Sequence, residues 1–195
     1  MSVIVFVESK NGKFSKAAFE AVSYGNKIGP VTVVTFGSTD NSVLSSLGNY
    51  GAKKVLVNRN VTNHNDQQLT KLIVAAVNQE SAEVVIVSQD QLGKAIGPRV
   101  AAKLGAGHVS GAIALPNTSN GFVVKTNVYS GKAFANVAVH TAKKVISLIP
   151  NAMAPEATGG SAEVVEFNKA EKSLKIKVNN HQYTLEIKDK FDELL

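Results

Sequence analysis

The sequence predicts an α/β protein with a doubly wound parallel sheet, and two observations lead to that fold class. Short runs of residues are apolar throughout, as at residues 3–7, which is typical of strands buried on both faces of a parallel sheet. Longer stretches between them have apolar residues at helical spacing. Strands and helices that alternate at short intervals indicate right-handed βαβ crossovers. The 195 residues are enough for one such domain with a substantial core.

The first hundred residues contain four predicted strands and four predicted helices. The strands are expected at 3–7, 31–37, 54–57 and 84–88, and the helices at 14–28, 41–47, 66–77 and 91–104. Gly29 and Pro30 are expected to end the first helix. Asn41 and Asp66 are the expected N-caps of the second and third helices, and Asp90 is expected to cap the fourth.

After Gly107 the pattern changes to short apolar runs separated by turn residues. Strands are expected at 109–115, 121–129, 133–139 and 144–149, as antiparallel strands that extend or flank the parallel sheet. Residues 150–160 are rich in Ala, Pro and Gly and predict a loop. We therefore divide the chain into a domain over 1–150 and a linker or tail over 151–195. Alternating residues in this tail predict a β-hairpin over 173–188, or a linker that is ordered only against another part.

Composition excludes several classes of function. The sequence has no cysteine, which rules out disulfides and cysteine-based catalytic or metal sites. Its four histidines are far apart and show no metal-binding spacing, so no metal is expected. The net charge of +6 is compatible with nucleic acid, but the basic residues are scattered and only two are arginines, so no nucleic-acid partner is expected. No apolar stretch is long enough to insert in a membrane, and no signal peptide is recognisable, so we expect a cytoplasmic protein.

Two segments are candidate ligand sites, because ligands of open α/β sheets bind at the carboxyl ends of the strands. The polar loop 8–13 follows the first strand, but no glycine fingerprint supports it, and an ordinary βα loop is the alternative. In the second segment, Gly93 and Lys94 stand at a helix N-terminus that can hold an anion. Arg99 suits a two-donor grip on a carboxylate or phosphate, or an ion pair with a neighbouring acid. No catalytic residue is predicted, since no nucleophile elbow or acidic metal motif occurs.

Residues 93–104 (GKAIGPRVAAKL) and 128–133 (VYSGKA) resemble two segments of the alpha subunit of electron-transfer flavoproteins, and the similarity extends over about residues 1–165. The resemblance implies the amino-terminal domain of that subunit, with a fold like that of the adenine-nucleotide alpha-hydrolases. It implies an electron carrier rather than an enzyme: a heterodimer with a beta subunit that holds FAD and passes electrons from flavin dehydrogenases to a quinone reductase or another acceptor. Gly93, Lys94 and Arg99 are then the expected contacts to the cofactor or to another domain.

The sequence departs from that family's pattern in two respects. It has no SGGRG-like segment, the glycine-rich grip on FAD in the family, so we expect the main FAD site to be absent and this chain alone not to retain FAD. Gly111 stands where many relatives have an acid and Lys132 where many have Asn, which puts polar contacts from these positions in doubt. The alternative hypothesis is a stand-alone adenine-nucleotide-binding module, with a pocket formed by residues 8–13 and 93–99.

Overall fold

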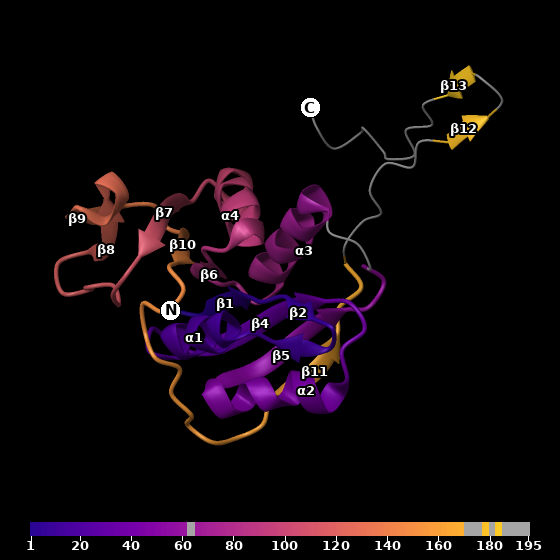
Figure 1. Ribbon diagram of the computed structural model, residues 1–195, viewed down its shortest axis with the longest axis horizontal. Helices are drawn as coiled ribbons and strands as arrows, with labels where there is room; N and C mark the ends of the chain where they lie inside the picture. The colour runs from indigo at the N-terminus through magenta and orange to yellow at the C-terminus, as the bar shows by residue number, and fades with distance from the viewer. Residues whose placement is uncertain (62–64, 170–176, 180–181, 185–195) are drawn as a thin grey trace.

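The computed structural model describes residues 1–61, 65–169, 177–179 and 182–184 of the chain. Within these residues a nine-stranded sheet has the order β11-β5-β4-β1-β6-β10-β7-β8-β9 (Figure 1). Its strands are β1 Val3–Phe6, β4 Val31–Phe36, β5 Ala52–Asn58, β6 Val84–Ser88, β7 Gly107–Ala112, β8 Phe122–Val128, β9 Ala133–Val139, β10 Lys144–Leu148 and β11 Glu163–Glu166. The helices are α1 Lys16–Asn26, α2 Asn41–Ser45, α3 Asp66–Gln79 and α4 Gln91–Leu104, with 3-10 turns η1 Ser46–Tyr50 and η2 Tyr129–Gly131.

Two apolar layers enclose the sheet, one on each face. Val3 and Val5 of β1 pack with α1 and α2 in one layer, whereas Ile4 and Phe6 pack with α3 and α4 in the other. Successive side chains of a strand point to opposite faces, so a strand covered on both sides must be apolar at every position. The continuous apolar runs thus have the origin expected for them, and the α/β prediction with a doubly wound parallel sheet is confirmed.

Antiparallel strands were predicted for the second half of the chain, which is correct for β8 and β9 and wrong for β10. β8 pairs antiparallel with β7 and with β9. β10 instead lies between β6 and β7 and is parallel to both. Four of its five residues are buried, because this central strand has neighbours on both edges and layers on both faces. Its apolar run is therefore the same signal that marked the parallel strands of the first half.

Local signals at the helix starts were partly misassigned. Asn65, not Asp66, caps α3, and its side chain accepts from the N–H groups of Gln67 and Gln68. α2 is preceded by Asp40, and Asn41 is its first residue rather than its cap. The first helix begins at Lys16 rather than at the predicted Phe14. The residues before it pair as a short hairpin, β2 Ser9–Lys10 with β3 Lys13–Phe14. Its Asn-Gly turn has positive φ at both residues, a turn signal that the sequence analysis did not use.

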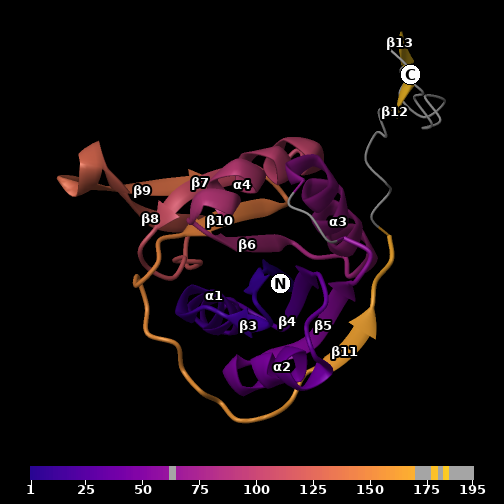
Figure 2. The same ribbon diagram turned by 45° about the vertical axis from the view of Figure 1, so that its right-hand side comes forward.

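A strap of residues 150–162 joins β10, in the interior of the sheet, to β11 at one edge. It leaves β10, crosses the α1 side of the molecule and reaches β11, which adds to β5 in parallel at the sheet edge (Figures 1 and 2). The predicted loop 150–160 is thus present, but β11 was not predicted. Backbone N–H groups of the strap donate to α1, α2 and η1: Asn151 to Glu20 Oε2 (2.8 Å), Glu156 to Ser23 Oγ (3.0 Å), Ala162 to the Ser45 carbonyl (2.9 Å) and Thr158 to the Asn49 carbonyl (2.7 Å).

The predicted hairpin over 173–188 lies mostly outside the described residues. Within them, β12 Lys177–Asn179 and β13 Gln182–Thr184 pair antiparallel.

Candidate functional site

The candidate site lies where the strand order of the sheet reverses. β4 and β5 follow β1 on one side, and α3 then returns the chain to β6 on the other side of β1. Ligands of open α/β sheets bind at such a switch point, outside the carboxyl ends of the strands. A cavity of about 90 Å³ is found there. It is lined by Phe6, Val7, Glu8, Lys10, Ser15, Ala18, Ser88, Asp90, Leu92 and Gly93. The two candidate segments of the sequence, loop 8–13 and the start of α4, therefore meet.

Gly93 is required by the tight turn from β6 into α4. A Cβ atom at this position would lie 1.7 Å from the carbonyl oxygen of Ser88, so no other residue fits without a backbone shift. The N–H of Gly93 donates to Asp90 Oδ1 at 2.8 Å, which confirms Asp90 as the N-cap of α4. This N–H group is thus already used inside the protein and does not point free at an anion.

The charges around the cavity are mostly negative. Glu8 and Asp90 both line it, and Lys10 lies 3.7 Å from Glu8 between Nζ and Oε2. The Lys10 side chain is 77% exposed whereas that of Glu8 is 10% exposed, so the carboxylate is the inner group of the pair. The buried hydroxyl of Ser88 has no hydrogen-bond partner among the described residues. A pair of carboxylates and a hydroxyl do not favour a phosphate.

The cavity does not fit a dinucleotide. Sites for drug-sized ligands and cofactors have volumes of about 300–1,000 Å³, several times the volume present here. With two carboxylates in the lining, the residues present fit neither FAD nor an adenine nucleotide. The arrangement has room for water or another small polar group.

The structure does not bring all three predicted site residues together. Gly93 lines the cavity, Lys94 is exposed on the first turn of α4, and Arg99 lies further along the same helix. Arg99 lines a groove of about 700 Å³ between α3 and α4, with Gln67, Thr70, Lys71, Val74, Ala102 and Lys103. Within the described part of the chain, the Arg99 side chain has no hydrogen bond or ion pair. A role of these residues in cofactor binding stays a prediction.

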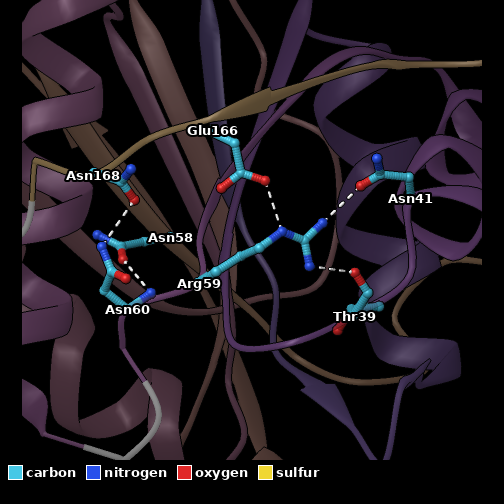
Figure 3. Close-up of polar contacts among 7 residues, drawn as sticks. All are labelled: Thr39, Asn41, Asn58, Arg59, Asn60, Glu166 and Asn168. Carbon is cyan, nitrogen blue, oxygen red and sulfur yellow. Dashed lines mark hydrogen bonds and ion pairs between the residues drawn. The ribbon is translucent and has the colours of Figure 1, made fainter.

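Arg59 lies at the centre of a polar cluster that was not predicted from the sequence (Figure 3). It follows β5, and its guanidinium donates from Nε to Glu166 Oε1 (2.6 Å) and through its two terminal nitrogens to the Thr39 carbonyl (2.8 Å) and Asn41 Oδ1 (2.6 Å). Arg59 thereby joins the loop after β4, the start of α2 and the last residue of β11. An arginine two residues after the predicted strand 54–57 was the available signal.

Two titratable side chains, one buried and one half-buried, lie outside this site. His108 of β7 is half-buried, its Nε2 is 2.8 Å from Ser147 Oγ, and burial lowers its pKa. Tyr24 of α1 donates to the Ala114 carbonyl at 2.9 Å, and burial raises its pKa. His108 is therefore neutral at pH 7, and Tyr24 is protonated. Tyr24 thus links α1 to the segment after β7, and His108 links β7 to β10.

The described residues give no sign of a metal centre or a membrane span. No three His, Asp or Glu side chains in this part of the chain gather as ligands would. None of the helices it contains combines the length and hydropathy needed to cross a bilayer.

The fold and the switch-point site define a doubly wound α/β protein of the kind that the sequence predicted. Residues 3–172 match the family model described as the electron transfer flavoprotein domain, and the chain belongs to that family. It is 32% identical over 140 residues to the electron transfer flavoprotein subunit alpha of Bacillus subtilis, which covers 69% of this chain and 43% of the relative. It is 28% identical over 165 residues to the subunit of the same name from Syntrophomonas wolfei, covering 83% of this chain and 52% of the relative.

A third relative, the protein FixB of Clostridium saccharobutylicum, is 26% identical over 145 residues, which cover 70% of this chain and 43% of FixB. The chain thus spans about half the length of the curated relatives it matches. The resemblance stated from residues 93–104 and 128–133 is confirmed.

Proposed function

We propose that this chain acts as the amino-terminal domain of an electron transfer flavoprotein alpha subunit, an electron carrier. The observation that carries this proposal is the family match over residues 3–172, together with relatives whose names identify them as alpha subunits. In this role the domain scaffolds the FAD site of a complete complex and docks the beta subunit. The complex takes electrons from flavin dehydrogenases and passes them to a quinone reductase or another acceptor.

The chain's contribution in this proposal is structural rather than chemical. The flavin performs the redox chemistry of such a complex, and protein groups orient and surround it. The small, carboxylate-lined cavity supports the proposal that this domain by itself holds no flavin. Lys94 and Arg99 are exposed, and we assign them to contacts with a neighbouring domain or subunit rather than to the cavity.

The test compares this chain alone with the chain mixed with the beta subunit of the same organism. The purified chain should be colourless, and it should co-elute with the beta subunit on a sizing column. A stoichiometric yellow flavin spectrum from the chain alone would overturn the scaffold role, and separate elution of the two proteins would overturn the docking role.

A stand-alone adenine-nucleotide module is the competing function, because loop 8–13 and Gly93 do meet at the switch point. The size of the cavity, its two carboxylates and the remote position of Arg99 oppose it. Calorimetry with AMP, ATP and FAD separates the two functions. We expect no micromolar binding, whereas micromolar binding of AMP or ATP that weakens in Arg99→Ala would favour the module.

A further inference from the structure

The charges of this protein are distributed very unevenly along the chain. No Asp or Glu occurs from residue 91 to residue 155, and seven cations do: Lys94, Arg99, Lys103, Lys125, Lys132, Lys143 and Lys144. The remaining residues contain fourteen cations and all fifteen acids, so they are close to neutral. In the fold, residues 91–155 form α4 and strands β7, β8, β9 and β10, which lie together at one end of the sheet. That end is cationic, and the net charge of the protein originates there.

The edge strand at this end, β9, is not protected against pairing with another chain. In the described part of the chain no strand pairs with its outer edge. Its seven residues, AFANVAV, include neither a charge nor a proline. The opposite edge strand, β11, has four residues, begins and ends with glutamate, and is held by Arg59. Proteins usually shorten or charge an edge strand to prevent it from pairing with another chain, as β11 illustrates. β9 has the properties of an edge that is meant to pair.

Exposed aromatic residues accompany this edge. Tyr129 at the β8–β9 turn is 81% exposed, and Phe134 of β9 is 63% exposed. Tyr129 and Ser130 both have positive φ, at 50° and 55°, an unfavourable conformation for residues other than glycine. The Nζ of Lys125 lies 4.6 Å from the centre of the Phe134 ring. The hairpin extends from the sheet end opposite β11 (Figures 1 and 2). Exposed aromatic side chains are typical anchors of protein interfaces.

We propose that β9 and the β8–β9 turn form the surface that docks a second, acidic subunit, whose edge strand pairs with β9. Every second residue of an edge strand turns its N–H and C=O groups outward, and a partner strand satisfies them. The partner carries carboxylates opposite Lys125 and Lys132, since complementary charges steer association and reject wrong partners. A second copy of this chain does not meet this requirement, because its own edge brings the same lysines and no acid. This inference rests on the proposed function, in which the partner is the beta subunit.

The experiment measures binding of the purified beta subunit to this chain and its variants by biolayer interferometry. Phe134→Ala should raise the Kd about tenfold or more, as is usual for an aromatic anchor. Lys132→Glu should raise the Kd several-fold, and the loss should shrink at high salt. Lys53→Glu makes the same charge change at an exposed position on β5, in the other half of the sheet, and should leave the Kd within about twofold. Circular dichroism checks that each variant is folded.

The possible outcomes separate this inference from the proposed function. Wild-type affinity in both Phe134→Ala and Lys132→Glu overturns the docking surface and leaves the proposed function standing. Failure of the wild-type chain to bind the beta subunit overturns both. Light scattering of the chain alone gives the third outcome. A dimer that Phe134→Ala dissociates would assign β9 to a second copy and overturn the assignment to an acidic partner.

Discussion

The replacement Arg59→Met tests whether the Arg59 cluster holds β11 on the sheet. Methionine keeps much of the apolar stem and removes all the donors of the guanidinium. Three hydrogen bonds are lost: those to Glu166, to the Thr39 carbonyl and to Asn41 (Figure 3). β11 itself is short and pairs with β5 on one side only, so the Arg59 contact adds to the ladder that attaches it.

The magnitude follows from the exposure of the groups. The ion pair with Glu166 is worth about 0–1 kcal/mol, because the side chains are 32% and 52% exposed and water screens them. The other two hydrogen bonds contribute about 1 kcal/mol each. Arg59→Met should therefore lower the free energy of unfolding by about 2–3 kcal/mol, which corresponds to a decrease in Tm of about 5–10 °C for a chain of this size.

Thermal unfolding followed by circular dichroism measures the global effect, and hydrogen exchange of the β11 amides measures the local one. A loss of 2 kcal/mol corresponds to exchange about 30-fold faster. Lys54→Met is the matched control, since it removes a single 3.2 Å ion pair with Glu80 from β5, and it should cost less than about 1 kcal/mol. Equal stability and equal β11 exchange in Arg59→Met and wild type would refute the reasoning.

Two further predictions concern Gly93 and His108. Gly93→Ala should cost about 2 kcal/mol or more, because the added carbon meets the Ser88 carbonyl and displaces the Asp90 cap; a loss below about 0.5 kcal/mol in urea unfolding would contradict this. Burial lowers the pKa of His108 from its ordinary 6.5, so the unfolded chain takes up a proton first and stability falls as pH drops below about 6.5. His108→Gln should reduce that fall between about pH 7.5 and 5.5, and an identical pH dependence in wild type would contradict the argument.

The parallel core was predictable because a strand that is buried on both faces has a continuous run of apolar residues in the sequence. Residues 3–7 and 84–87 are apolar throughout for this reason. Residues 145–148 are likewise all buried. The direction of this strand, however, depends on the route of the chain after β9, which no local residue determines. β11 has only two apolar residues between glutamates, and its pairing with β5 depends on a strap that runs from β10 across the α1 side to the sheet edge. Long-range topology, not local propensity, decided both errors.

Residues of the candidate site could be predicted only where they come just after the end of a parallel strand. Loop 8–13 and Gly93 follow neighbouring parallel strands, so they meet at one edge of the sheet. Arg99 follows Gly93 by six residues, a rotation of about 600° around the helix, and it therefore points to a different face. Arg59 also follows a strand, but the identity of its partners depends on β11, which had not been predicted.

The uneven charge changes how the net charge of this protein should be interpreted. A count of scattered lysines indicates a weakly basic surface, whereas the absence of acids from residues 91–155 indicates one cationic end of a sheet. These two interpretations predict different responses to salt. If the charge were a diffuse property of the surface, salt would have little effect on any one interaction. If it serves a docking surface at β9, raising the ionic strength should weaken binding of the acidic partner and leave the buried core, and hence the stability of the chain, nearly unchanged.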